Sequence, residues 1–331
     1  MSPPLLELRR VSRRFGQPLG LLKTLANRLG AHHQPRAVHA VDGIDLHVGD
    51  NEVLGLVGES GCGKSTVARL ICGLNPPSDG EIFYQGEALA SITDVDRLLQ
   101  IQMIFQNPMA SLNPRLTVAD IIGEAPVVHG RWAARERDGR VRELLLQVGM
   151  DASHADRYPH EFSGGQRQRI GIARALALQP RLLLCDEPVA ALDVSTQAQV
   201  VNLFMQLKQQ LQLSYLFISH DLGIVRHLSD RVAIMYLGRI VESAPVEELF
   251  EHANHPYTQA LLASMPQIGR GAGQFAAVQG EIPSPLDPPR GCHFHPRCPF
   301  AMPRCRVEVP LLREVAPGHL SACHLNDGGD A

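Results

Sequence analysis

Short apolar runs alternate with segments of helical spacing over residues 5–250. Three runs have the length of a buried strand: EVLGLVG at 52–58, RLLLCDE at 181–187 and SYLFISH at 214–220. Residues 65–74 place four apolar side chains on one face of a helix, and a Ser-Gly-Gly turn opens a second helix over 163–178. Continuous apolar strands that alternate with helices predict an α/β domain with a largely parallel sheet.

The regular spacing fades after about Phe250. Residues 265–289 are rich in Gly and Pro, which predicts a linker or an irregular extension. It leads to a cysteine cluster in a segment dense in Pro, Arg and His. A separate insertion at 20–30 (GLLKTLANRLG) has the spacing of an amphipathic helix. We expect this helix to pack on its own domain; a membrane surface or a partner is the alternative, so its role stays open.

Composition and charge limit the function classes. The 331 residues are 44% hydrophobic and 20% charged, which suits one large domain with an appendage. Lys and Arg number 31 against 34 Asp and Glu, a net charge of −3, so bulk attraction to nucleic acid is disfavoured and no nucleic-acid partner is expected. The chain has no apolar run of membrane-spanning length, and its start, MSPPLLELRR, lacks the order of a secretory signal, which predicts a cytoplasmic protein.

The strongest chemical signal is GESGCGKST at 58–66. It matches G-x-x-x-x-G-K-[ST] and lies between a predicted strand and a predicted helix, as a phosphate-binding loop does. Backbone N–H groups of such a loop converge on phosphate oxygens, the Lys reaches the β and γ phosphates, and the Ser hydroxyl binds Mg²⁺. The predicted nucleotide-binding residues of the loop are Gly58, Ser60, Gly61, Gly63, Lys64, Ser65 and Thr66.

A second group of residues predicts hydrolysis. Asp186 ends the apolar strand Leu182 to Cys185, where a carboxylate can hold Mg²⁺ directly or through water. The next residue, Glu187, is placed to polarise a water molecule that attacks the γ-phosphate. The alternative is that Asp186 and Glu187 are ordinary solvated acids at a strand end. The presence of a phosphate loop in the same chain makes this alternative the weaker one.

The motif FSGGQRQR at 162–169 resembles the signature of ATP-binding-cassette ATPases. Other elements follow in that family's order: Gln106 resembles the Q-loop glutamine, residues 191–193 (Ala-Leu-Asp) the D-loop, and His220 the switch histidine. Phe15 is similar in position to the aromatic residue that stacks on adenine. The resemblance implies a P-loop NTPase of ABC type over 5–250, which has a RecA-like core, an antiparallel β subdomain and a helical subdomain at about 107–178.

The resemblance also implies roles for individual residues. Gln106 would take part in catalysis, bind Mg²⁺ and, with the loop after it, sense the coupling helices of the permease partners. His220 would hold the γ-phosphate and help orient the attacking water. Two such cassettes pair head to tail in this family, so the signature residues of one subunit would contact ATP held by the other. The residues concerned are Ser163, Gly164, Gly165 and Gln166, with Asp193 in the D-loop. Ala190 stands where these ATPases more often have Ser, a departure that puts contacts across the pair in doubt.

Three further stretches resemble the ATPases of dipeptide, oligopeptide and nickel importers: IFQNPMASLNPRLTV at 104–118, DVSTQAQV at 193–200 and HPYTQALLASMP at 255–266. This resemblance implies a subunit at the cytoplasmic face of the inner membrane that uses ATP to import peptides. Its implied partners are two transmembrane permease subunits, an extracytoplasmic binding protein and a second ATPase. A related heterodimer partner is expected, and a homodimer stays open. Nickel or another solute is the alternative cargo; an ATPase acting on DNA or ribosomes is a rival of another class.

The extension at 251–331 carries four cysteines, Cys292, Cys298, Cys305 and Cys323, with the spacing C-x5-C-x6-C-x17-C. Some ATPase subunits of dipeptide importers resemble this pattern and hold a four-iron four-sulfur cluster, which is the expectation here. Four thiolates also suit tetrahedral zinc, and the interleaved histidines leave a mixed Cys/His zinc site open. A segment that binds no metal is the remaining alternative.

Overall fold

The computed structural model describes residues 3–16, 37–265 and 280–327. The predicted amphipathic helix at 20–30 lies outside these residues, as does most of the Gly- and Pro-rich segment. The chain divides into two compact units. The first comprises Met1–Leu6, His47–Val57 and Tyr84–Arg231, and the second comprises Glu7–Leu46, Gly58–Phe83 and Val232–Ala331. Each unit is described by itself.

A parallel sheet forms the centre of the first unit. Its strands lie in the order β3 (Val53–Val57), β8 (Ser214–Ser219), β7 (Leu182–Asp186) and β6 (Ile101–Ile104), and each neighbouring pair is parallel. All residues of β3, β7 and β8 are buried, as their continuous apolar sequences predict. The prediction of strands at these three positions is confirmed. Helix α9 (Leu222–Leu228) packs against β3 and β8.

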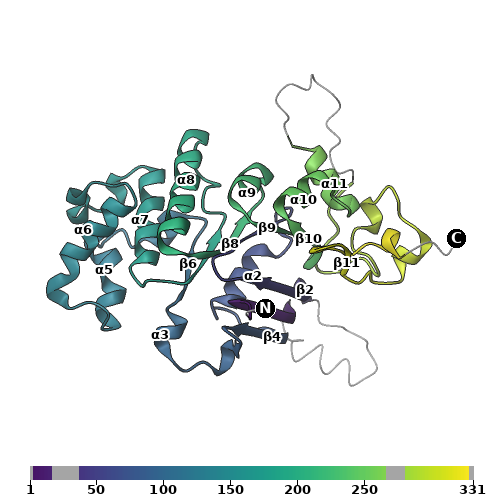
Figure 1. The fold of residues 1–331 in the computed structure, drawn as a ribbon, viewed down its shortest axis with the longest axis horizontal. Helices are drawn as coiled ribbons and strands as arrows, with labels where there is room; N and C mark the ends of the chain where they lie inside the picture. Colours follow the sequence, from purple (N-terminus) through teal and green to yellow (C-terminus); the bar gives the residue numbers. More distant parts are fainter. Residues whose placement is uncertain (1–2, 17–36, 266–279, 328–331) are drawn as a thin grey trace, which may run out of the picture. The chain divides into compact units, whose positions relative to one another are not determined.

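Four helices of the first unit pack on one another: α4 (Pro108–Ser111), α5 (Val118–Val128), α6 (Arg137–Gln147) and α7 (Gly164–Leu176). Figure 1 shows α5, α6 and α7 as a group. The long helix α8 (Val194–Leu211) follows β7. The shorter elements are β5 (Glu87–Ala88), η1 (Leu89–Ser91), α3 (Val95–Leu98), η2 (Ala134–Glu136), η3 (Ala152–Asp156) and η4 (Pro159–Glu161).

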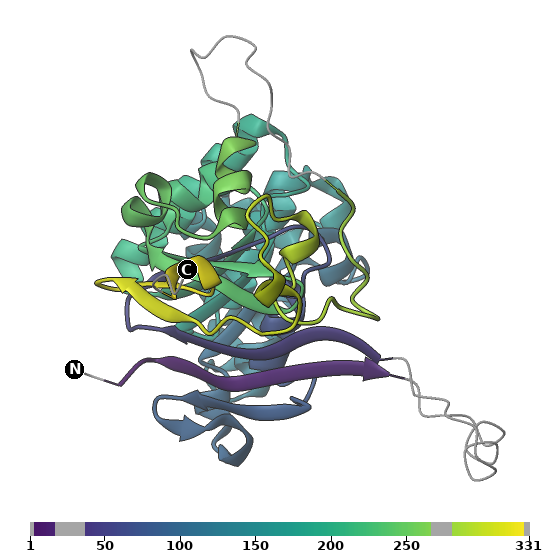
Figure 2. The same ribbon diagram turned by 90° about the vertical axis from the view of Figure 1, so that its right-hand side faces the viewer.

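The second unit contains the long strands of the antiparallel β subdomain, and it also contains the phosphate loop. β1 (Leu6–Gly16) lies between β2 (Ala37–Val48) and β4 (Asp79–Tyr84) (Figure 2). The loop that follows β3 leads into α2 (Lys64–Ile71), which is shorter than the predicted helix at 65–74. Apolar residues of α2 are buried along one face, including Val67, Leu70 and Ile71.

The C-terminal segment adds strands to this unit that the sequence pattern did not indicate. β12 (His319–Ser321) pairs antiparallel with β10 (Arg239–Pro245) and with β11 (Arg313–Ala316), while β9 (Arg231–Tyr236) lies on the other side of β10. The remaining elements are α10 (Val246–Glu251), α11 (Pro256–Ala263), η5 (His295–Arg297), η6 (Pro303–Arg306) and η7 (His324–Asn326). Among the described helices of both units, none is long and apolar enough to cross a membrane.

Candidate functional site

The phosphate loop wraps around its own lysine. Lys64 is 4% exposed, and its Nζ donates hydrogen bonds to the carbonyl oxygens of Gly58 at 2.7 Å and Glu59 at 3.0 Å. The Sγ atom of Cys62 lies 3.9 Å from the same nitrogen. The loop therefore holds a buried ammonium group at the N-terminus of α2, where the helix dipole also favours anions.

Two glycines of the loop are required by close backbone approach. Gly63 has a φ of 113°, and a Cβ there would lie 2.0 Å from the carbonyl oxygen of Ala40. A Cβ on Gly58 would lie 2.2 Å from the carbonyl oxygen of Met235. Any larger residue would displace the backbone at these positions, so the motif's glycines are explained by packing as well as by phosphate binding. Ser60 and Gly61 are exposed, and Ser65 and Thr66 are half-buried in the first turn of α2.

In the first unit, Glu187 contacts the other two residues that were predicted to act in hydrolysis, Gln106 and His220. Its Oε2 accepts a hydrogen bond from Nε2 of Gln106 at 2.9 Å and lies 3.4 Å from Nδ1 of His220. Its backbone has a φ of 46°, a strained value for a non-glycine residue, and its N–H donates to the carbonyl oxygen of Ile218. The fold thus brings together Glu187, Gln106 and His220 from three strand ends, with the nearly buried Asp186 directly before Glu187.

The predicted signature residues form a capped helix start. The Ser163 hydroxyl accepts a hydrogen bond from the Gln166 backbone, and the Gln166 side chain accepts one from the Ser163 backbone, which together form a capping box. A Cβ on Gly165 would lie 2.2 Å from the Thr196 side chain, so the signature packs against the first turn of α8. Gly164 has room for a Cβ in ordinary contact with Leu192.

Asp193 caps α8. Hydrogen bonds from the hydroxyl of Ser195 and from the backbone and hydroxyl of Thr196 lower the pKa of Asp193 to about 2. The D-loop carboxylate is therefore ionised and held by its own helix. Phe15, near the end of β1, is 38% exposed, and the Arg13 guanidinium lies 4.6 Å above its ring. An exposed ring beside a cation suits stacking on a flat aromatic ligand such as adenine.

Comparisons with known proteins decide the family. Residues 41–190 match the ABC transporter family model, and residues 241–305 match the model described as oligopeptide/dipeptide transporter, C-terminal region. The chain is 49% identical to the oligopeptide transport ATP-binding protein AppF of Bacillus subtilis over 97% of both chains. This chain belongs to the ABC transporter family. It is an ABC ATPase of the oligopeptide/dipeptide type.

Other relatives agree with this assignment. The chain is 45% identical to the dipeptide transport ATP-binding protein DppF of Haemophilus influenzae, over 92% of this chain and 94% of the relative. The solved ATP-binding cassette MJ0796, a dimer bound to ADP and phosphate, superposes with a TM-score of 0.61 at 25% identity and covers 73% of this chain and 98% of its own. CbiO1 of Clostridium perfringens, with a TM-score of 0.62 at 24% identity, covers 75% of this chain and 91% of its own and shows the fold alone. The predicted ABC-type P-loop fold is confirmed.

The four late cysteines of this ABC ATPase line one small cavity of about 10 Å³, together with Phe294 and Phe300. The backbone N–H of Cys292 donates to the carbonyl oxygen of Cys305 at 2.9 Å, which fixes two of the four close together. Within the described residues, however, no three Cys, His, Asp or Glu side chains are arranged to hold a metal ion. Burial raises the pKa of Cys292 to about 11, so its thiol stays protonated in the absence of a metal. The donor set suits a thiolate-bound group, but the side-chain arrangement is not that of a formed metal centre.

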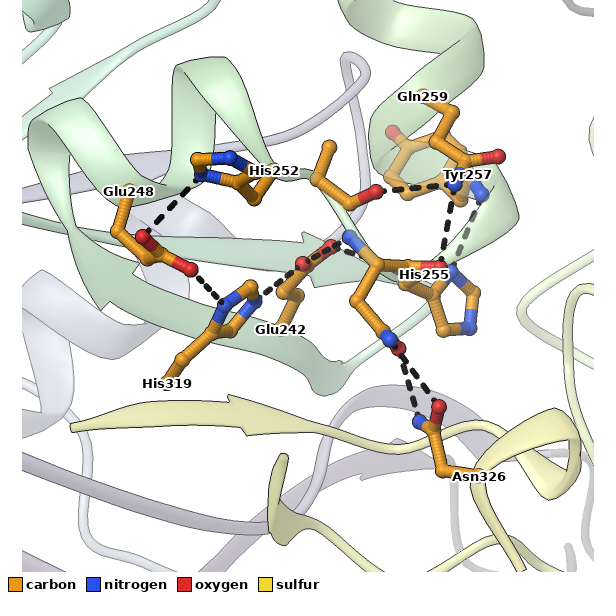
Figure 3. Close-up of polar contacts among 10 residues, drawn as sticks. Glu242, Glu248, His252, His255, Tyr257, Gln259, His319 and Asn326 are labelled. Carbon is orange, nitrogen blue, oxygen red and sulfur yellow. Dashed lines mark hydrogen bonds and ion pairs between the residues drawn. The ribbon is translucent and has the colours of Figure 1, made fainter. Parts of the chain in front are cut away.

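A buried polar network joins the extension of the ABC ATPase to β10 (Figure 3). The Glu242 side chain, which is fully buried, accepts hydrogen bonds from the backbone N–H groups of Asn254 and His255, and its Oε1 lies 2.7 Å from Nε2 of His319. Nδ1 of His319 lies 3.3 Å from Glu248, so this ring bridges β10 and α10. The network shows how β12 is fastened to the rest of the second unit.

His255, the first residue of the HPY sequence, caps α11. Its Nδ1 accepts a hydrogen bond from the backbone N–H of Tyr257, which requires a ring without a proton on that nitrogen. Burial lowers the pKa of His255 to about 4, so the ring is neutral at physiological pH. The HPY histidine therefore acts as a helix cap within the described structure.

Sequence reasoning missed a contact between the phosphate-loop residue Glu59 and two residues of the extension, Tyr257 and Arg297. Both Oε atoms of Glu59 bind the Arg297 guanidinium, at 2.7 and 3.0 Å, and the Glu59 backbone N–H donates to the Tyr257 hydroxyl. Glu59 stands at a variable position of the motif, and Arg297 is one of several arginines beside the late cysteines. The opposite charges of Glu59 and Arg297 were the signal in the sequence that could have indicated this contact. Many other acidic and basic residues of the chain could form such a pair equally well.

Proposed function

We propose that this ABC ATPase uses ATP hydrolysis to energise the import of dipeptides or oligopeptides. The observation that carries the proposal is the oligopeptide/dipeptide C-terminal region at 241–305, on a chain that has the phosphate loop and the Glu187 group. The relatives AppF and DppF are named for oligopeptide and dipeptide transport, and each aligns with more than nine tenths of this chain. We divide the chain into an ATPase domain at 5–250 and an extension at 251–331.

We propose the following roles for the site residues. Lys64 and the loop backbone bind the phosphates of ATP, and Ser65 and Asp186 hold Mg²⁺, which neutralises charge on the phosphates. Glu187 orients and polarises the attacking water, while Gln106 and His220 hold the Glu187 carboxylate and contact the water and γ-phosphate. Because Glu187 is only 15% exposed and receives both contacts, its carboxylate is held in one place for this task.

Several partners complete the proposed transporter. Ser163, Gly164, Gly165 and Gln166 would contact the γ-phosphate held by a second ATPase subunit, because the positive end of the helix dipole at a helix N-terminus attracts anions. We propose a related subunit as that partner; a second copy of this chain is the other arrangement. Two transmembrane permease subunits and an extracytoplasmic binding protein would complete the importer, with this chain at the cytoplasmic face of the inner membrane.

Solute uptake by cells tests the cargo. A host strain that lacks the gene should lose uptake of labelled dipeptides or longer peptides, and the wild-type gene should restore it. Glu187→Gln should not restore it, because the amide cannot accept a proton, whereas the exposed-surface control Glu143→Gln should. Loss of nickel uptake with unchanged peptide uptake would contradict the peptide proposal and favour the nickel alternative.

We also propose that Cys292, Cys298, Cys305 and Cys323 hold a four-iron four-sulfur cluster, with zinc as the alternative. The four cysteines line the same small cavity, and four thiolates match the donor set of either group. The full chain purified without oxygen should show visible absorption and about four irons per chain. Cys298→Ser should lose both, and Cys72→Ser, outside the extension, should keep both. Zinc, or no metal, in the wild-type protein would contradict the cluster.

A further inference from the structure

Glu59 is an acidic side chain in a loop that binds a polyanion. A carboxylate close to the phosphates of ATP opposes binding unless its charge is compensated, since like charges repel strongly where water is excluded. Arg297 provides this compensation with a bidentate ion pair, and its side chain is only 4% exposed. The pair is therefore screened from solvent on the arginine side, and Glu59 strongly favours the charged form of Arg297, whose pKa is raised.

Every polar group of Glu59 is engaged. Its carboxylate binds Arg297, its N–H donates to the Tyr257 hydroxyl at 3.0 Å, and its carbonyl oxygen accepts from Lys64. Two of these three partners come from the C-terminal extension, while Lys64 belongs to the loop itself. The extension therefore fixes both the backbone and the charge of the loop residue that precedes Ser60.

The two partners from the extension are themselves fixed by packing. Tyr257 is fully buried, and its ring lies 4.6 Å from that of Tyr236 and 5.4 Å from that of Phe294, centroid to centroid. The Arg297 guanidinium lies over the Tyr236 ring at 5.8 Å and donates to the Tyr236 hydroxyl. Because aromatic neighbours restrict the rotamers of both side chains, they present preformed partners to Glu59.

We propose that Arg297 and Tyr257 are positioning residues for ATP, which act on the phosphate loop through Glu59. Arg297 cancels the charge that Glu59 would present to the nucleotide, and Tyr257 holds the start of the loop in its binding conformation. The C-terminal extension is thereby a working part of the nucleotide site. Arg297 and Tyr257 act on ATP binding alone, whichever solute is transported.

Binding of mant-ATP to the purified full chain tests the proposal. Arg297→Met should weaken binding about tenfold, because it leaves an uncompensated carboxylate in the loop. Glu59→Gln in the same chain should return the dissociation constant to within about threefold of wild type, since it removes the carboxylate. Glu59→Gln alone should bind mant-ATP more tightly than Arg297→Met alone, because it carries no uncompensated carboxylate. Arg313→Met, which removes an exposed arginine of the extension, is the matched control and should leave binding unchanged.

Rescue of ATP binding by Glu59→Gln distinguishes a positioning role of Arg297 from a role in folding alone. If Arg297→Met binds within twofold of wild type, or if Glu59→Gln fails to rescue it in a folded double variant, the charge role of Arg297 is overturned. Tyr257→Phe keeps the ring and removes only the hydroxyl, so it serves even if Arg297→Met does not fold. It should weaken binding about fivefold, the effect of one hydrogen bond. Unchanged binding would overturn the role of Tyr257.

Discussion

Replacing His319 with alanine should lower the free energy needed to open the pairing between β12 and β10 by about 3 kcal/mol. His319 is 2% exposed and lies 2.7 Å from Glu242, whose side chain is fully buried. Removing the hydrogen-bond partner of a buried acceptor costs about 1–3 kcal/mol, and more when the acceptor is charged, because the acceptor is left unsatisfied. About 3 kcal/mol is expected here, since two backbone N–H groups still donate to Glu242 in the variant.

Hydrogen exchange measured by mass spectrometry reports this opening directly. A change of about 3 kcal/mol corresponds to about a hundredfold faster exchange for peptides that cover β10 and β12. The Ala322 N–H, which donates to the Val241 carbonyl oxygen, belongs to this group. His252→Ala is the control: it removes a ring that is 67% exposed and paired with Glu248, and should change exchange by no more than about threefold.

A second variant distinguishes the charge from the lost side-chain volume. In Glu242→Gln with His319→Ala, no carboxylate is left uncompensated, so the double variant should be less destabilised than the sum of the two single variants by about 1–3 kcal/mol. Strict additivity would refute the reasoning, because a cavity alone would then explain the loss. An effect of His319→Ala no larger than that of His252→Ala would refute it as well.

Three further outcomes are expected. Glu187→Gln should abolish ATP hydrolysis while ATP still binds, measured as phosphate release and mant-ATP fluorescence; unchanged hydrolysis would reject Glu187 as the base. Gly63→Ala should abolish mant-ATP binding, because its Cβ meets a backbone oxygen, whereas Gly86→Ala, at a φ of 78° in open space, should leave binding unchanged. Because the folded-state pKa of His255 is about 4, the unfolded chain alone takes up its proton as the pH falls from 6.5, so stability should decrease by about 1.4 kcal/mol per pH unit down to pH 4. His255→Asn, which keeps a helix cap, should reduce that slope in urea unfolding series; an unchanged slope would contradict the assignment.

Local signals in the sequence were sufficient for the core of the ATPase. The strands β3, β7 and β8 are continuous apolar runs, and α7 begins at a Ser whose capping partner stands three residues later. These features depend on neighbours within a few residues, so they can be found without knowing the fold. The same holds for the phosphate loop, whose glycines and lysine lie within nine consecutive residues.

The sequence by itself determined the ATPase motifs, their order and the elements that carry them. Only the tertiary structure decided that Arg297 pairs with Glu59 across 238 positions and that His319 meets Glu242 across 77. Neither pair has a local pattern, because each member is one charged or titratable residue among many, and its partner is selected by packing. Aromatic packing around Arg297 selects its partner Glu59, and the pairing of β12 with β10 selects the partner of His319. Both arrangements exist only once the chain has folded.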